Sequence, residues 1–281
     1  MLVFLNGGFL VEEEARISLD DRGFLLGDGV YDTLSVSNGR IHRWSQHWQR
    51  FESGAKFLKI KLALENAEAE KVARKLIEQN AATEAVLRIA LSRGTGTRGY
   101  SIGGANKPTL LMKLYPPVKR EVGVPQWRLL TSIFRVHAND PLTSVKHSSK
   151  VRHTLARMEA EEASANEAIL LNTEGRVAEA VSANVFCIQN GNVFTPPLNE
   201  GALPGTARGA VLEICRNLKI AAFEKPIAPE ELLNAEGVFL TNTTFQIIEA
   251  IELNKRSLRR SSLTKAIADA FTELVRNETR K

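Results

Sequence analysis

The sequence is poor in cysteine, and no long apolar run occurs in it. Only Cys187 and Cys215 occur in 281 residues, both in apolar segments and without the CxxC spacing of redox or metal motifs. This usage excludes a disulfide scaffold and predicts two buried, reduced thiols in a cytoplasmic protein. No apolar run reaches the ~18 residues of a membrane span. The apolar start, residues 1–9, has no basic segment or cleavage pattern, so we expect no signal peptide.

Positive charge is in only small excess over negative charge. The formal net charge is +5, and the positive residues are scattered except for one short run: Lys255, Arg256, Arg259 and Arg260. A nucleic-acid site needs clustered Lys and Arg with interleaved aromatics, and aromatics make up only 6% of the chain. We therefore interpret the run as a solvated surface, and we expect neither nucleic acid nor a membrane as a partner, and no metal site.

The residues that are present suit a globular enzyme. Hydrophobic residues make up 43% of the chain, enough for a substantial core. Alternating strand patterns, Asn-Gly turns and helical periodicities follow one another along the sequence, which predicts a mixed α/β (α+β) fold. Pro116-Pro117 stops the chain and predicts a boundary between two lobes, residues 1–118 and 119–281.

Three local features can carry chemistry. Gly205-Thr206 opens a predicted helix, where backbone amides and the helix dipole favour an anion. The segment 241–244, Thr-Asn-Thr-Thr, ends a predicted strand with three hydroxyls. Lys146 directly precedes another predicted helix. Each feature alone is more typical of a helix cap, a turn or a surface lysine.

Taken together and in order, these features resemble class IV aminotransferases, also called fold-type IV pyridoxal 5'-phosphate (PLP) enzymes. The resemblance covers nearly the whole chain. Its strongest part is residues 174–186, which end in the family's Asn-x-Phe as Asn184-Val185-Phe186. The other matching segments are residues 21–23, 27–34, 47–51, 145–149, 195–197 and 203–208. The resemblance implies a small N-terminal α/β lobe and a larger, β-barrel-like C-terminal lobe with helices, with PLP between the lobes.

The resemblance assigns the reacting groups. Lys146 would carry PLP as a Schiff base and then move the substrate proton. Glu179 would face the pyridine nitrogen and keep it protonated, and Tyr31 would line the substrate side of the ring. The family usually has Leu-Asn two and three residues after the lysine, where this chain has Ser148 and Ser149. Lys150 is the alternative nucleophile, but it matches no family position.

The same resemblance predicts the phosphate site. Arg50 would hold the cofactor phosphate through a charge-assisted fork. The backbone at Gly205 and Thr206 would complete this site, together with the hydroxyls of Thr243 and Thr244.

The reaction remains open between two branches that both act on a small-molecule amine. Residues 92–100 and Thr33 resemble the 4-amino-4-deoxychorismate lyases, which release pyruvate and 4-aminobenzoate, a folate precursor; this is the leading interpretation. Tyr31 in Gly-Asp-Gly-Val-Tyr resembles the D-amino-acid aminotransferases instead, so a transaminase of D- or branched-chain amino acids is the alternative. In both, Arg98 would hold a substrate carboxylate from a loop that reaches the partner subunit, which implies a homodimer.

Overall fold

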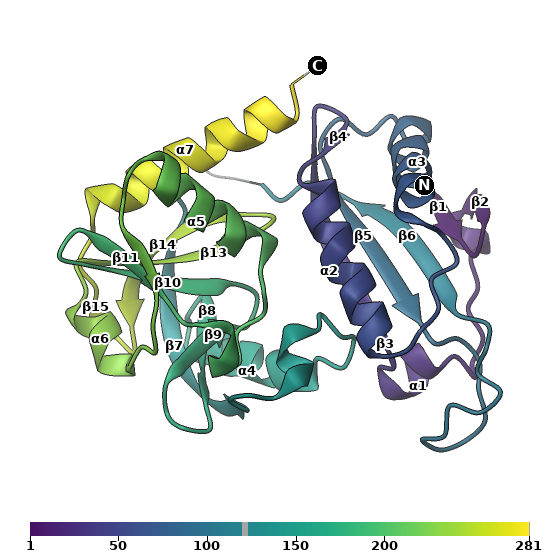
Figure 1. Ribbon diagram of the computed structural model, residues 1–281, viewed down its shortest axis with the longest axis horizontal. Coiled ribbons are helices and arrows are strands. Elements are labelled where there is room, and N and C mark those ends of the chain that lie inside the picture. The colour runs from purple at the N-terminus through teal and green to yellow at the C-terminus, as the bar shows by residue number, and fades with distance from the viewer. Residues whose placement is uncertain (120–122, 281) are drawn as a thin grey trace. The chain divides into compact units, whose positions relative to one another are not determined.

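The computed structural model describes residues 1–119 and 123–280, and these form two compact units (Figure 1). The first unit comprises Met1–Val118, Val145–Lys150 and Asn277–Lys281, and the second comprises Lys119–Ser144 and Val151–Arg276. The short segment Val145–Lys150 thus belongs to the first unit, although the sequence analysis assigned it to the C-terminal lobe. This matters for function because it contains Lys146.

The first unit is built on a six-stranded antiparallel sheet with the order β2-β1-β6-β5-β3-β4. Its strands are β1 (Leu2–Leu5), β2 (Gly8–Val11), β3 (Gly29–Ser37), β4 (Arg40–Ile41), β5 (Ala85–Ser92) and β6 (Thr109–Tyr115). The predicted hairpin at the start of the chain is confirmed. Asn6 and Gly7 connect β1 to β2 with φ angles of 50° and 98°, the left-handed values of a tight hairpin turn.

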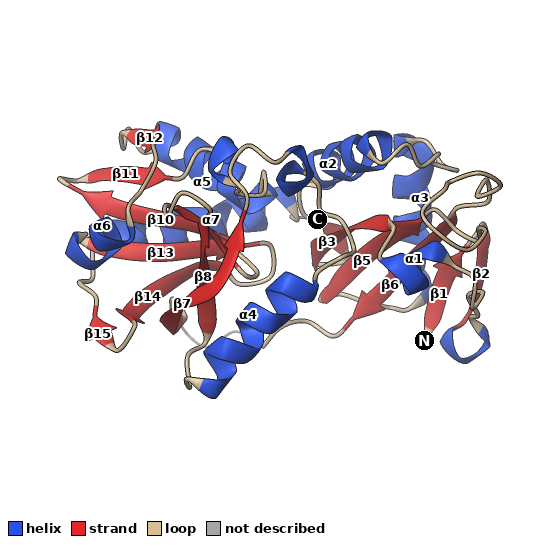
Figure 2. Ribbon diagram, turned by 90° about the horizontal axis from the view of Figure 1, so that it is seen from below, coloured by secondary structure: helices blue, strands red, loops and turns tan. Residues whose placement is uncertain are grey.

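Two helices cover one face of this sheet (Figure 2). They are α2 (Trp44–Phe57) and α3 (Asn66–Gln79); a short helix, α1 (Arg22–Leu26), precedes β3. Apolar residues of α2 and α3 recur at helical spacing and pack on alternate residues of β3, β5 and β6. On β5, for example, Leu87, Ile89 and Leu91 are buried in this core. The intervening residues of these strands lie on the opposite side, hereafter the outer face of the first sheet.

The second unit contains a nine-stranded sheet with the order β12-β11-β10-β13-β14-β7-β8-β9, and β15 pairs with β14. Most pairs are antiparallel, while β14 with β7, β7 with β8 and β11 with β12 are parallel. The strands are β7 (Gln126–Val136), β8 (Glu167–Asn172), β9 (Val177–Ala180), β10 (Asn184–Gln189), β11 (Asn192–Thr195), β12 (Ala222–Glu224), β13 (Gly237–Asn242), β14 (Gln246–Leu253) and β15 (Arg256–Ser257).

Helices close three cores around this second sheet. α5 and α7 pack over β10, β13 and β14, α4 packs on β7 and β8, and α6 closes the core of the other face. The helices are α4 (Val151–Glu162), α5 (Thr206–Asn217), α6 (Pro229–Asn234) and α7 (Ser262–Glu278). Helices and sheets in both units confirm the predicted mixed α/β class. None of the helices within residues 1–119 and 123–280 is long and apolar enough to cross a membrane.

Candidate active site

The Lys146 segment runs alongside the start of β3 as a short additional strand. Tyr31 N–H donates to the Lys146 carbonyl at 3.0 Å, and Ser148 N–H donates to the Gly29 carbonyl at 2.8 Å. Ser149 lies against Gly27, and a Cβ added to Gly27 would come within 3.0 Å of the Ser149 Cα. Glycine at position 27 therefore permits the close approach of the segment that follows Lys146.

Lys146 lies over the ring of Tyr31. Its Nζ is 4.8 Å from the ring centroid, within the range of a cation–π contact. The guanidinium carbon of Arg88, on β5, is 3.9 Å from the same centroid. Tyr31 and Arg88 are on the outer face of the first sheet, and so is Thr33, which is directly opposite Arg88 in the β3–β5 register. Lys146 and Arg88 thus both contact Tyr31, and Thr33 lies on the same face of the sheet.

The half-buried side chain of Arg88 has no salt-bridge partner among the described residues. Its guanidinium makes no side-chain hydrogen bond or ion pair there and lies on the ring of Tyr31. Two buried arginines are paired instead: Arg93 with Asp28, and Arg208 with Glu224. A guanidinium without a carboxylate partner, on the ring that Lys146 also contacts, can bind an anion, because it keeps its hydrogen-bond donors for a ligand.

Arg50 is held by a buried carboxylate. Its Nε and Nη2 donate to the two oxygens of Asp32 at 2.9 and 2.7 Å, and His47 Nδ1 lies 2.9 Å from Asp32 Oδ1. Burial alone would raise the pKa of Asp32, but the charges and hydrogen bonds of Arg50 and His47 hold it well below its ordinary value. Burial lowers the pKa of His47, so the ring is neutral near pH 7 and donates Nδ1–H to the carboxylate.

Asp32 therefore fixes the side chain of Arg50, the residue predicted to bind the cofactor phosphate. The bidentate pair uses two of the five N–H donors of the guanidinium. Tyr31 and Asp32 are neighbours on β3 and point to opposite faces of the sheet. β3 thus contacts Lys146 through Tyr31 on one face of the sheet and Arg50 through Asp32 on the other.

The loop that carries Arg98 is anchored at its base. Arg22 Nη1 donates to the carbonyls of Gly99 and Ser101 at 2.9 and 3.1 Å, and its Nε pairs with Asp28. Burial would raise the pKa of Asp28, but the bonds from Arg93 and Arg22 hold it below its ordinary value. Arg98 itself is exposed. The family motif at residues 21–23 is therefore structural here, since it shapes this loop.

Glu179, in the second unit, is fixed by two neighbours. Leu203 N–H donates to Glu179 Oε2 at 2.9 Å, and His153 Nε2 lies 3.4 Å from Oε1. The residue is only 9% exposed. A carboxylate can only accept hydrogen bonds, so His153 Nε2 carries the proton in this contact. Its buried Nδ1 has no partner among the described residues.

The start of α5 lies beside Glu179. Leu203 carbonyl accepts from Asn184 Nδ2 at 2.8 Å and from Gly205 N–H at 2.8 Å. Gly205 is required here, because a Cβ would lie 2.0 Å from Asn184 Oδ1. Thr206 begins the helix directly after it and is almost buried. The positive end of this twelve-residue helix thus begins three residues after Leu203, the residue that holds Glu179.

The threonine turn joins this arrangement through β10 and β13. Asn184 is opposite Thr241 in their antiparallel register. Beyond it, Asn242 Oδ1 accepts from the backbone N–H of Thr244 at 3.1 Å and of Phe245 at 2.8 Å, which closes the turn between β13 and β14. Contacts through Leu203, Asn184 and Thr241 therefore link Glu179, the α5 start and the turn with Thr243 and Thr244 within the second unit.

Three supporting residues escaped the sequence analysis. Arg88 could have been found, because a charged residue interrupts the apolar pattern of residues 85–91. Asp32 was part of a quoted motif, but its pairing depends on how α2 packs against β3. His153 carried no signal, since nothing in the sequence indicates that it meets Glu179.

Comparison with known proteins assigns the family. The sequence profile of class IV aminotransferases (Amino-transferase class IV) matches residues 29–253, so the chain belongs to this family. Proteins of this class use PLP, and the chain is therefore a PLP-dependent enzyme.

Individual relatives span the full length of the chain. A Methanocaldococcus jannaschii protein whose name assigns it to the branched-chain-amino-acid aminotransferases is 29% identical, over 98% of this chain and 96% of the relative. D-alanine aminotransferase of Bacillus licheniformis is 28% identical, over 100% of this chain and 99% of the relative.

Solved structures share the fold. The branched-chain aminotransferase of Thermoproteus uzoniensis has a TM-score of 0.93 and 27% identity, covering 100% of this chain and 96% of its own. A Legionella pneumophila protein named as a 4-amino-4-deoxychorismate lyase has a TM-score of 0.87 and 23% identity, covering 94% and 98%, and shows the fold alone.

The donor set of the chain fits PLP. An amine beside an aromatic ring suits the cofactor aldehyde, and a fixed carboxylate suits the pyridine nitrogen. A guanidinium and a helix start with neighbouring hydroxyls suit a phosphate dianion. The amine of Lys146 and the guanidinium of Arg50 belong to the first unit, and the carboxylate of Glu179 and the α5 start belong to the second.

Proposed function

We propose that the chain is an amino-acid transaminase, which moves an amino group between an amino acid and a 2-oxo acid. The observation that carries this proposal is the Arg88 guanidinium on the ring of Tyr31, the ring that Lys146 Nζ also contacts; within the part of the chain that the structure describes, the Arg88 side chain has no anionic partner. Amino acids and 2-oxo acids both carry a carboxylate next to the reacting carbon. The near-full-length relatives named as aminotransferases support the same reaction.

Each site residue has a distinct part in this reaction. PLP, when bound, supplies a ring that accepts the electrons left behind when the substrate loses its proton. Lys146 binds the cofactor and then moves that proton from the carbon next to the amino nitrogen. Glu179 accepts a hydrogen bond from the pyridine nitrogen and favours its protonated form, because a fixed carboxylate stabilises a nearby positive charge.

Phosphate binding is assigned to both units. Arg50, oriented by Asp32, donates to the phosphate, and the α5 start at Gly205 and Thr206 donates backbone N–H groups. The hydroxyls of Thr243 and Thr244 complete the set. Tyr31 lines the substrate side, and its ring contacts both Lys146 and Arg88.

Arg88 and Arg98 are proposed to recognise substrate carboxylates. Replacing Arg88 by Gln should raise KM for the amino acid about 10- to 100-fold, the size of one charge-assisted hydrogen bond, with a smaller effect on kcat. Arg88→Lys keeps the charge without the planar fork and should recover part of the loss. An unchanged KM in Arg88→Gln would remove this residue from substrate binding.

A homodimer is part of the proposal. The first unit exposes apolar side chains on α1 and on the Arg98 loop: Phe24 is 68% exposed, Leu25 57% and Tyr100 90%. Exposed apolar residues that are near one another are typical of an interface. Sedimentation of the purified protein at micromolar concentration should give twice the chain mass, and a monomer at that concentration would contradict this part.

The lyase is the second candidate, and Thr33 is the observation that favours it. This residue follows Tyr31 on the outer face, and it carries a hydroxyl opposite Arg88. The reaction would release pyruvate and 4-aminobenzoate from aminodeoxychorismate without a second substrate.

A single-turnover mixing experiment separates the two reactions. Purified holoenzyme is mixed with D-alanine, with L-leucine or with aminodeoxychorismate made in situ, and cofactor absorbance is followed. For a transaminase, one of the amino acids converts the cofactor to its amine form, and a 2-oxo acid restores it. If only aminodeoxychorismate reacts, with release of pyruvate and 4-aminobenzoate, the transaminase proposal fails and the lyase stands.

A further inference from the structure

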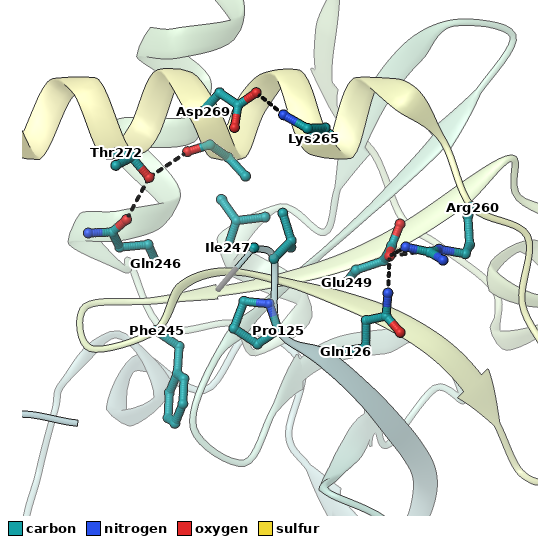
Figure 3. Close-up of a pocket in the computed structure, with 13 residues that line it drawn as sticks. Pro125, Gln126, Phe245, Gln246, Ile247, Glu249, Arg260, Lys265, Asp269 and Thr272 are labelled. Carbon is teal, nitrogen blue, oxygen red and sulfur yellow. Dashed lines mark hydrogen bonds and ion pairs between the residues drawn. The ribbon is translucent and has the colours of Figure 1, made fainter. Parts of the chain in front are cut away.

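A cavity in the second unit includes none of the residues proposed for the reaction or for cofactor binding (Figure 3). It is formed by the segment leading into β7, by the start of β14 and by one side of α7, and its volume is about 590 Å³. Cavities that bind small molecules have volumes of roughly 300–1,000 Å³. Phe245 also belongs to the turn that carries Thr243 and Thr244, so the cavity adjoins that turn without including either threonine.

The cavity has one buried acidic group with an unused oxygen. Glu249, on β14, is only 6% exposed. Its described side-chain contacts all fall on Oε2, which pairs with Arg260 Nη2 at 2.6 Å and Nε at 2.8 Å and lies 3.4 Å from Gln126 Nε2. Within residues 1–119 and 123–280, Glu249 Oε1 makes no hydrogen bond or ion pair. A carboxylate oxygen of a largely buried residue, left without a donor, favours a ligand that donates an N–H group, ideally a cationic one.

Positive charge lies on the same side of the cavity. Arg260 and Lys265 both line it, and in Figure 3 they lie near Glu249 and on the helix above it. Lys265 pairs with Asp269 one turn further along α7, but both side chains are more than half exposed, so this pair contributes little and exchanges readily. These two cations can therefore attract a ligand carboxylate.

The remainder of the wall is largely apolar. Five apolar residues line the cavity: Val124, Pro125, Phe245, Ile247 and Ala268. Figure 3 shows Pro125 and Ile247 between Gln246 on one side and Glu249 on the other. Such a surface stabilises a hydrocarbon side chain by roughly 25 cal/mol for each Å² removed from water. The cavity thus combines an N–H acceptor, two cations and an apolar wall.

We propose that this cavity is a second, non-catalytic binding site for an apolar amino acid. The ligand ammonium donates to Glu249 Oε1, its carboxylate lies toward Arg260 and Lys265, and its side chain contacts Ile247 and Phe245. No residue assigned to the reaction takes part. The site therefore does not depend on which reaction the enzyme catalyses.

Calorimetric titration with L-leucine tests the site. Holoenzyme is first reduced with borohydride, which fixes PLP to its lysine and prevents turnover. Two analogues share the hydrocarbon body: 4-methylvalerate lacks the amine, and 3-methylbutylamine lacks the carboxylate. We expect L-leucine to bind about 10- to 100-fold more tightly than either analogue, because each analogue loses one charge-assisted contact.

Variants locate the binding. Glu249→Gln should weaken L-leucine binding at least 10-fold, while Glu252→Gln, with the same charge change on the same strand, should leave it unchanged. Ala268→Met fills the cavity without altering charge and should also abolish binding. Melting temperatures within a few degrees of the parent exclude unfolding as the cause. If Glu249→Gln and Ala268→Met both bind L-leucine like the parent, or the reduced parent does not bind it, the proposal is wrong.

Discussion

The two units hold their functional residues in different ways. In the first unit, side chains fix other side chains: Asp32 orients Arg50, and the ring of Tyr31 contacts Lys146 and Arg88. In the second, the backbone predominates: the Leu203 amide fixes Glu179, and Gly205 is close to Asn184. Changes of charge should therefore damage the first unit most, and changes of shape the second.

The largest effect is expected where the first unit supplies the reacting amine. Lys146→Ala should lower turnover by at least about 10⁴-fold, because both the covalent link and the proton transfer are lost. The absorbance band of lysine-bound PLP should also disappear. Lys150→Ala is the matched control four residues later, and we expect near-parental activity because Lys150 matches no position of the family pattern. If Lys150→Ala loses the band and Lys146→Ala keeps it, the assignment is reversed.

The next largest effect is expected for the buried ion pair of Asp32 and Arg50 in the first unit. Asp32→Asn keeps the shape but leaves Arg50 and His47 without their anion, which should reduce the free energy of unfolding by about 3–5 kcal/mol. Urea unfolding followed by tryptophan fluorescence measures this loss. Weaker PLP binding should accompany it, since Arg50 is no longer oriented.

The pH dependence of this loss follows from the lowered pKa of Asp32. A carboxyl group with a lowered pKa in the folded state stabilises the fold fully above its unfolded pKa, about 3.9. The stabilisation is lost as the pH falls below that value toward the folded pKa. The difference between parent and Asp32→Asn should thus be constant from pH 5 to 7 and shrink below about pH 4. A difference that grows on acidification would contradict the buried ion pair.

Much of the fold could be predicted because its signals are local. Asn38-Gly39 and Asn190-Gly191 mark turns through backbone angles that few residues tolerate, and both have positive φ in the structure. The apolar period of residues 263–275 likewise predicts α7. These features depend only on neighbours in sequence, so the sequence alone suffices.

Contacts that depend on long-range packing could not be predicted from the sequence. The family motifs identify Lys146, Glu179 and Arg50, but they do not indicate that Asp32 holds Arg50 or that His153 meets Glu179. On α4, the apolar Val151, Leu155 and Met158 share one helical face, but the structure exposes all three and buries Ala156 and Ala160. Which face is covered depends on the strands that pack against the helix, and the period of the sequence does not specify those strands.

Within the second unit, a change of charge should have a moderate effect. Glu179→Gln removes the anion but keeps the acceptor for the Leu203 amide, so PLP should stay bound. Turnover should fall by roughly 100-fold, the size of one electrostatic contact in an active site. Full activity in this variant would assign ring protonation to another group.

His153 refines this test. His153→Leu removes the second neighbour of Glu179, and His153→Gln restores an N–H donor near the same position. We expect a loss below 10-fold in His153→Leu, with recovery in His153→Gln, measured as kcat together with the absorbance of bound PLP. Equal losses in both would indicate a packing role only.

The smallest effect, and the sharpest test of the comparison, concerns Gly205, the N-cap of α5, and Gly209 within the helix. A Cβ at Gly205 would lie 2.0 Å from Asn184 Oδ1, whereas nothing is within 4 Å of a Cβ at Gly209. Gly205→Ala should therefore destabilise the protein by about 1–3 kcal/mol through overpacking and weaken PLP binding, because Asn184 and the α5 start must move apart. Gly209→Ala should stabilise the helix by about 0.5–1 kcal/mol. Thermal unfolding with and without PLP measures both changes. If both variants shift stability equally and in the same direction, backbone shape does not govern the second unit as argued.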